Sequence, residues 1–182
     1  MTDASLIGKV MTVTGPIEAG EMGITLPHEH LLIDHTPDRV VLSDPDLAVQ
    51  ELMIYAGAGG HTVVELSNGG IGRDPTGLRT ISEATGVNIV MGCGYYKRKW
   101  HPGDMDRRTV DQLEEEMVSD ILLGVGETGI RAGVIGEIGV TDSLEGNEEK
   151  CVIASARAQI RTGVALNFHV HLNDKVEEEK LR

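Results

Sequence analysis

Short apolar runs, rich in β-branched residues, alternate along this chain with longer stretches whose apolar side chains recur at helical spacing. Runs of this length are too short for helices, and their nearly continuous apolar character is typical of buried parallel strands. The pattern therefore predicts five strands, at residues 24–30, 62–66, 87–93, 134–138 and 164–170. Residues 10–13 are expected to form a smaller ribbon with the segment before Ile24.

The stretches between these runs carry signals for the beginning and the end of helices. Asp44 and Asp74 each precede a proline, and this pair of residues favours a helix N-terminus. A glycine after the last apolar position is a common helix stop. We predict four helices, which begin at residues 45, 75, 110 and 147 and end at residues 57–60, 86, 124 and 163, and the start of another helix within residues 177–182.

This alternation of strands and helices predicts the α/β class, with a parallel sheet that is either doubly wound or closed as a barrel. In both arrangements ligands bind at the C-terminal ends of the strands. No G-x-G-x-x-G sequence follows the first predicted strand, which disfavours a nucleotide-binding doubly wound fold. With 182 residues, 40% of them hydrophobic, the chain is expected to form a single domain over residues 1–182.

Two histidines, His28 and His30, lie two residues apart near the end of the first predicted strand. Alternate residues of a strand face the same side, so the two imidazoles can bind one cation. Imidazole is the commonest protein ligand of zinc-like ions. The pair alone is equally compatible with two polar residues at a strand end, so the interpretation depends on the other strands.

The last two predicted strands supply further candidate ligands. Glu137 interrupts the apolar run of the fourth strand, and a buried carboxylate needs a cation beside it, either an arginine or a metal ion. Most basic residues fall in predicted loops and helices, which favours the metal. His169 and His171 form a second pair at the end of the fifth strand. Together with His28 and His30, these residues outline a site in which a carboxylate bridges two ions and an ester is hydrolysed.

Composition and charge narrow the range of functions. A formal net charge of −13 argues against a nucleic-acid-binding surface, and the basic run Lys97-Arg98-Lys99 is expected to be a solvated loop. Cys93 and Cys151 have neither disulfide-framework nor thiolate-site spacing, and Cys151 is expected to be a core residue. Because the chain has no leader-like beginning and no long apolar run, we expect a cytoplasmic protein without a membrane segment.

Several stretches of the chain resemble the phosphotriesterase-like branch of the amidohydrolase superfamily. They cover nearly the whole chain in the family's order and spacing, at residues 12–16, 26–31, 63–66, 70–74, 89–96, 129–139 and 162–169. The resemblance implies a (β/α)8 TIM barrel with two divalent ions, usually zinc, at the C-terminal rim of its strands. It also implies hydrolysis of phosphotriesters, lactones or related esters.

The resemblance implies ligand roles by position. His28 and His30 would hold the more buried ion, and His169 would hold the more exposed one. Many members bridge the two ions with a carbamylated lysine. The fourth strand here has no lysine, so Glu137 is similar to the bridging glutamate of the homology-protein type.

Other matched positions have more than one interpretation. Tyr95 and Tyr96 correspond to aromatic residues of the substrate pocket, although either can equally pack at the rim. His171 corresponds to no ligand, and we interpret it as capping the strand end or lining the pocket. Arg73 and Asp74 match a family signature, in which Asp74 is explained by its helix-capping position.

The family's barrel has eight strands, whereas five are predicted here, and a typical barrel needs about 250 residues. We therefore expect a barrel truncated after about five βα units: a shortened product, a half that a second copy or a completing chain extends, or a remnant. The family's proton-accepting aspartate belongs to the eighth strand. No catalytic residue is accordingly predicted in this chain beyond the metal ligands.

The sequence thus predicts a zinc-dependent hydrolase that cleaves an ester bond of a small molecule through a metal-bridging hydroxide. The ester would be a phosphotriester, a lactone or a related carboxylic ester. Two alternatives stay open. One is a catalytically inactive barrel fragment that binds metal or a partner chain, and the other is a deaminase or amidase of the wider superfamily, which shares the H-x-H pair on the first strand.

Overall fold

Five parallel strands form the main sheet of the computed structural model, which describes residues 7–36, 39–141, 144 and 146–170. The strands follow one another in the order β3-β6-β7-β8-β9. Their bounds are Ile24–Glu29 for β3, Gly60–Glu65 for β6, Asn88–Cys93 for β7, Val134–Val140 for β8 and Ala165–Val170 for β9. The five strands predicted from the apolar runs are confirmed, and their parallel pairing is as expected from the intervening helices.

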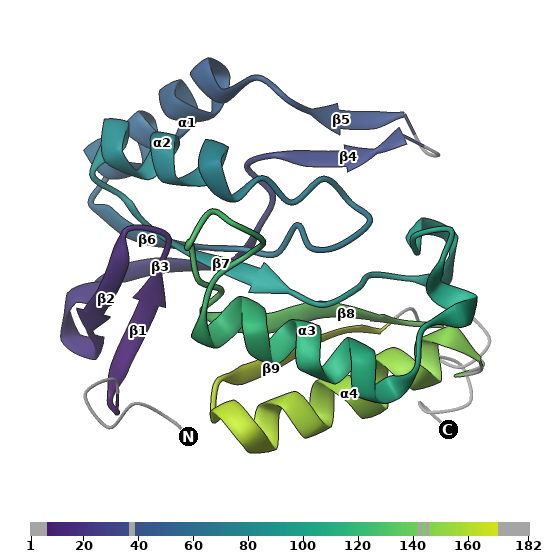
Figure 1. Cartoon of the computed structure of the whole chain (residues 1–182). Coiled ribbons are helices and arrows are strands. Elements are labelled where there is room, and N and C mark those ends of the chain that lie inside the picture. The colour runs from purple at the N-terminus through teal and green to yellow at the C-terminus, as the bar shows by residue number, and fades with distance from the viewer. Residues whose placement is uncertain (1–6, 37–38, 142–143, 145, 171–182) are drawn as a thin grey trace, which may run out of the picture.

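Each of the four helices connects two neighbouring strands of this sheet (Figure 1). The helices are α1 at Pro45–Gly57, α2 at Pro75–Thr85, α3 at Val110–Leu122 and α4 at Asn147–Thr162. Short 3-10 helices in loops of the described residues include η2 at Ala19–Met22, η4 at Arg98–Trp100 and η5 at Met105–Arg107. All four predicted helix starts are confirmed. The helix expected within residues 177–182, like His171, lies outside the described residues.

Two layers of apolar side chains pack on the sheet. The larger core lies between the sheet and the four helices and includes Val63, Ile89, Ile135 and Ile138 from the strands. A smaller cluster of Leu66, Val90 and Val134 lies on the other face, where Val10 of the N-terminal ribbon covers part of it. The result is a curved half-barrel with helices on one face, and within the described sheet each outer strand, β3 and β9, pairs with a single neighbour. The expected truncated barrel is therefore confirmed, and the doubly wound alternative is not.

Two antiparallel hairpins flank the sheet. The first, β1 at Lys9–Thr12 with β2 at Gly15–Glu18, confirms the predicted N-terminal ribbon. The second, β4 at Ile33–His35 with β5 at Val40–Leu42, was not predicted. Its strands have three residues each, which is too short for a hydrophobic period to be recognised.

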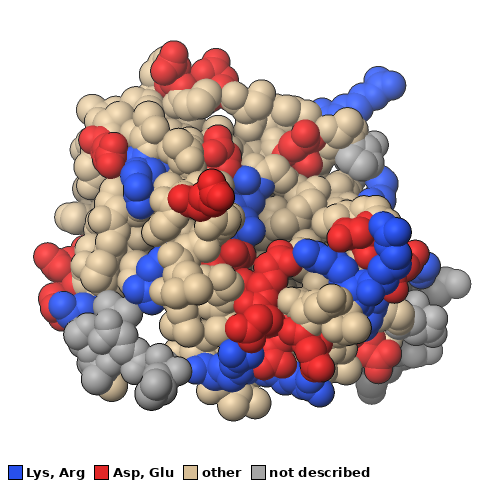
Figure 2. Space-filling model, viewed as in Figure 1, with Lys and Arg blue, Asp and Glu red and all other residues tan. Residues whose placement is uncertain are grey.

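The surface is charged over α3 and α4. Figure 2 shows acidic and basic groups side by side there, and Arg157 and Arg161 of α4 pair with acidic residues of α3, including Glu114 at 3.7 and 2.9 Å.

In the part of the chain that the structure describes, no helix is long and apolar enough to cross a membrane. Cys93 and Cys151 are both fully buried free thiols, and burial raises the pKa of Cys151 to about 12, which confirms it as a core residue.

Replacing Asp74 by alanine is expected to destabilise the protein by about 1 kcal/mol, because its side chain caps α2. The carboxylate accepts a hydrogen bond from the Gly77 amide at 2.9 Å. Asp74→Asn preserves an oxygen acceptor and is expected to cost much less. Urea unfolding of the two variants measures the difference, and equal losses of stability for both would show that the cap is unimportant.

Candidate metal centre

The four predicted ligands lie at the C-terminal ends of three strands. His28 belongs to β3 and His30 follows its last residue, Glu137 lies within β8, and His169 lies within β9. The parallel pairing of β8 with β9 places Gly139 opposite His169, so Glu137 and His169 reach the same rim. The expectation that separate segments bring these side chains together is met by the geometry.

Glu137 lies at the centre of the group and is 1% exposed. Its Oε2 atom is 3.0 Å from Nε2 of His28 and 2.6 Å from Nδ1 of His169, and its Oε1 atom is 3.4 Å from Nε2 of His30. Burial by itself would raise the pKa of Glu137, but hydrogen bonds to His30 and His169 outweigh burial and lower the pKa. The side chains that contact this carboxylate at these distances are imidazoles, whereas the alternative considered from the sequence was a core arginine.

His30 is held on its other side as well. Its Nδ1 atom is 3.0 Å from the Ser67 hydroxyl oxygen. Burial lowers the pKa of His30, but the hydrogen bond to Glu137 and the charges of Glu65 and Glu137 have the larger combined effect and raise it. Glu65 and Ser67 were not recognised as site residues from the sequence, where they appear only as polar positions at the end of an apolar run.

The two tyrosines after β7 point in different directions. The Tyr96 hydroxyl is 3.2 Å from Nε2 of His169, which places it at the site. The Tyr95 hydroxyl instead contacts Glu116 of α3 and Arg108. Burial and the contact with Glu116 raise the pKa of Tyr95. A substrate-binding role for either tyrosine stays a prediction, and Tyr96 is the better placed of the two.

The unpredicted β4–β5 hairpin also reaches this region. Its residue His35 stacks on Trp100 with ring centroids 4.8 Å apart, and the ring of Tyr96 lies 5.1 Å from that of Trp100. The ring of Tyr96 is in turn 5.0 Å from the ring of His169. A layer of aromatic side chains thus extends from His169 to the hairpin.

The donor atoms of His28, His30 and Glu137 suit a metal ion. One ligand atom from each residue lies within 4.8 Å of the other two. Two imidazole nitrogens and a carboxylate oxygen are the donor types that zinc and similar divalent ions prefer. His169 contacts the carboxylate of Glu137 but lies outside this compact group. The residues present therefore fit a metal ion, and His28, His30 and Glu137 are the residues that would hold it.

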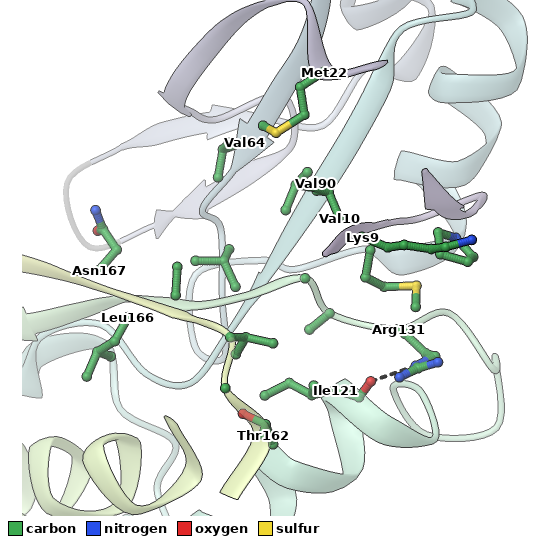
Figure 3. Close-up of a pocket in the computed structure, with 18 of the residues that line it drawn as sticks. Lys9, Val10, Met22, Val64, Val90, Ile121, Arg131, Thr162, Leu166 and Asn167 are labelled. Carbon is green, nitrogen blue, oxygen red and sulfur yellow. Dashed lines mark hydrogen bonds between the residues drawn. The ribbon is translucent and has the colours of Figure 1, made fainter. Parts of the chain in front are cut away.

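A cavity lies in another part of the half-barrel, away from the candidate ligands. It measures about 730 Å³ and is lined by Val64 and Val90 of the sheet, Lys9 and Val10 of the ribbon, and further residues that include Ile121, Arg131, Thr162 and Leu166 (Figure 3). None of the four predicted ligands lines it. Its lining includes the ribbon and the first residues of β8 and β9, Val134 and Ala165, so its size does not identify it as the reactive site.

Comparison with curated proteins gives relatives that are named as hydrolases. N-acetyltaurine hydrolases from Dictyostelium discoideum and Xenopus tropicalis are 32% and 35% identical, and the alignments cover 90% and 91% of this chain. They cover 59% and 57% of those proteins. The chain thus spans a little over half the length of these curated relatives.

Alignments with solved structures of the same fold also cover most of this chain and a little over half of the other chain. A resiniferatoxin-binding protein from Rhodobacter sphaeroides has a TM-score of 0.84 at 38% identity, over 94% of this chain and 60% of that chain. The phosphotriesterase homology protein from Escherichia coli has a TM-score of 0.80 at 31% identity, over 88% and 57%. An organophosphorus hydrolase from Deinococcus radiodurans has a TM-score of 0.79 at 29% identity, over 90% and 53%. The sequence model of the phosphotriesterase family matches residues 8–182, and the chain belongs to that family.

Proposed function

We propose that this chain carries the metal-binding half of a hydrolase that uses two divalent ions, with zinc as the expected metal. The observation that supports the proposal most strongly is the position of Glu137. A single buried carboxylate presents its two oxygens to Nε2 of His28 and Nε2 of His30 at 3.0 and 3.4 Å. Burying a carboxylate costs free energy unless a positive charge lies beside it. A metal ion bound between this carboxylate and the imidazoles would supply that charge.

When bound, divalent ions at this position supply Lewis-acid polarisation of the scissile bond and lower the pKa of water. The chain's own residues would hold and orient the reacting groups. His28 and His30 offer nitrogen lone pairs, and Glu137 contributes a negative charge with two donor oxygens. Tyr96 can hold His169 through the hydrogen bond at Nε2 and presents its ring beside it. In our proposal the substrate lies over this rim.

The leading substrate class is a small ester: a lactone, a carboxylic ester or a phosphotriester. It is supported by the family and by the organophosphorus hydrolase among the structural neighbours. A second class is favoured by the curated relatives, which are N-acetyltaurine hydrolases and therefore act on a carboxylic amide. Carboxylic esters, lactones and amides share an acyl carbon that is attacked by water, whereas a phosphotriester is attacked at phosphorus. The same rim can therefore serve an amide as well as a carboxylic ester.

Metal content and turnover test the proposal together. The purified chain is dialysed against Zn²⁺, its bound metal is counted by mass spectrometry, and it is offered a lactone, an aryl ester, an aryl dialkyl phosphate and N-acetyltaurine. We expect stoichiometric metal and turnover of at least one substrate, with both lost in His28→Ala. His61→Ala is a matched control, because His61 is an exposed histidine of β6 outside the group.

The possible outcomes separate the proposal from its alternative. Stoichiometric metal without turnover of any substrate, or turnover that His28→Ala leaves unchanged, would contradict the hydrolase and favour a metal-binding barrel fragment. No metal uptake by the wild-type chain would contradict the metal centre itself. Turnover of N-acetyltaurine alone would assign the amide class in place of the ester class.

A further inference from the structure

Three polar side chains at the end of β6 have no exposed surface and are not among the predicted ligands. Glu65, Ser67 and Asn68 are each 0% exposed. Burying polar groups costs free energy unless they are hydrogen-bonded, so their partners indicate why they are there. Each of the three contacts a segment that carries a candidate metal ligand.

Ser67 contacts a ligand directly. Its hydroxyl oxygen is 3.0 Å from Nδ1 of His30, while Nε2 of the same ring faces Glu137. A neutral imidazole carries its proton on one nitrogen only, and a hydrogen bond at that nitrogen leaves the other free to bind a metal. If Nδ1 donates to Ser67, the lone pair of His30 is at Nε2, on the side of the metal group.

Glu65 holds both ends of this contact. Its Oε1 atom accepts a hydrogen bond from the Ser67 amide at 2.8 Å, and its Oε2 atom accepts one from the amide of Leu31, the residue after His30. The carboxylate therefore joins the chain just beyond β3 to the chain just beyond β6. The Leu66 amide also donates to the carbonyl oxygen of Glu29 at 3.0 Å, which aligns the same two segments.

Asn68 reaches the third ligand segment. Its Nδ2 atom donates to the carbonyl oxygen of Glu137 at 2.5 Å, across the end of β7. β7 leaves room for this close approach of β8, because a Cβ atom at Gly92 would lie 2.2 Å from the carbonyl oxygen of Gly136. The end of β6 thus contacts the ligand segments on both sides of it.

We propose that Glu65, Ser67 and Asn68 are positioning residues of the metal centre, in which Ser67 fixes the proton of His30 on Nδ1 and Glu65 holds Ser67 in place. This inference deepens the proposed function and rests on it for the identity of the ligands. Although β6 carries no candidate ligand, this inference gives the end of β6 a role in the metal centre. The residues there set the orientation of His30 and the backbone position of Glu137.

The test is Ser67→Ala, measured by titration calorimetry of the full chain with Zn²⁺. We expect the affinity to fall about 10- to 100-fold, which is the usual effect of removing a hydrogen bond to a metal-bound histidine. Ser67→Thr retains the hydroxyl and is expected to restore most of the affinity. Glu65→Gln, which places an amide donor against one of two backbone amides, is expected to weaken binding without changing the volume of the side chain.

Ser82→Ala is the matched control. Ser82 is another buried serine, 5% exposed, and its hydroxyl donates to the Val87 carbonyl at 2.7 Å, away from the metal group. Its removal tests whether loss of any buried hydroxyl weakens metal binding through general destabilisation. The affinity of Ser82→Ala for Zn²⁺ is expected to equal that of the wild type.

A second measurement examines His30 in the Zn²⁺-loaded protein. Long-range ¹H–¹⁵N spectra of histidine show which ring nitrogen carries the proton, and we expect Nδ1 of His30 to be protonated because Nε2 faces the metal group. In Ser67→Ala this proton loses its hydrogen-bond acceptor and should exchange faster with solvent, a change that Ser82→Ala should not produce. If Ser67→Ala does not fold, Glu65→Gln and Ser67→Thr are compared by the same spectra.

The outcomes distinguish this inference from the proposed function. Wild-type protein that takes up no metal contradicts the proposed function, and this inference, which rests on it, falls with it. Unchanged metal affinity and an unchanged exchange rate of the His30 Nδ1 proton in Ser67→Ala would overturn the inference while leaving the metal centre standing.

Discussion

Replacing Glu137 by glutamine is expected to lower the affinity for Zn²⁺ by more than about 100-fold, the upper range for the loss of an outer-shell partner. The substitution removes the negative charge from the centre of the group while preserving shape. The carboxylate faces His28, His30 and His169 at 3.0, 3.4 and 2.6 Å, so a neutral amide leaves three imidazoles with no negative charge at the centre of the group. Titration calorimetry gives the affinity, and unfolding of the metal-free variant shows whether the fold is retained.

Glu148→Gln is a suitable control for this substitution. Glu148 is 2% exposed and accepts hydrogen bonds from the amides of Arg98 and Thr141, each at 3.0 Å, but it is not part of the metal group. Any loss of Zn²⁺ affinity that follows from removing a buried carboxylate in general should appear in both variants. If the two variants bind Zn²⁺ equally, Glu137 is not a ligand and the proposed centre is wrong.

The substitution Arg73→Met is expected to destabilise the fold by about 3 kcal/mol, because it leaves the buried carboxylate of Asp120 without a partner. The two side chains are 12% and 8% exposed and lie 2.7 Å apart. Methionine retains the aliphatic part of the arginine, so the change in the free energy of unfolding reflects the loss of the positive charge and its hydrogen bond. Denaturant unfolding monitored by circular dichroism measures it.

The loss of folding stability in Arg73→Met should depend on pH in a defined direction. Burial raises the pKa of Asp120, and attraction to Arg73 partly opposes that rise. Without Arg73 the folded-state pKa rises further above the unfolded value of about 4. A carboxyl with a raised folded-state pKa favours the folded state at acid pH, and this contribution is lost as the pH rises through that pKa. The destabilisation by Arg73→Met is therefore largest at neutral pH and shrinks toward about pH 4.

Two further variants test this explanation. Arg157→Ala breaks a pair with Asp111 whose side chains are 50% and 86% exposed, and it is expected to cost less than about 1 kcal/mol. The double variant Arg73→Met/Asp120→Asn should recover part of the stability that Arg73→Met loses, since no charge is then left buried. A double variant that is as unstable as the sum of the two single changes would show that the pair does not interact.

The order of elements and the candidate ligands were predictable because they depend on short stretches of chain. Asp44 and Asp74 cap α1 and α2 through amides two or three residues away. His28, His30, Glu137 and His169 are recognisable because polar residues interrupt apolar strands, and parallel strands end at one edge. Their convergence on one carboxylate followed from those two facts, whereas their roles as ligands await the metal titration.

Other features depend on contacts between distant segments. Arg73 and Asp120 are 47 positions apart, and the sequence showed the arginine only as part of a family signature. Tyr95 and Tyr96 are adjacent and equivalent in the sequence, yet one hydroxyl contacts α3 and the other contacts His169. The β4–β5 hairpin and its His35 were missed because three-residue strands carry no clear period.

By itself, the sequence determined the alternation of strands and helices, the helix ends and the candidate ligands, because hydrophobic period, capping and strand direction act over a few residues. The truncated barrel was predicted from the resemblance to a known family. The tertiary structure alone decided which groups support those residues. Glu65, Ser67 and Asn68 are ordinary polar positions in the chain, and they gain a role only because parallel packing brings the ends of β3, β6 and β8 within hydrogen-bonding distance. Hydrogen bonds need atoms about 3 Å apart, and that proximity is set by the packing of the whole sheet.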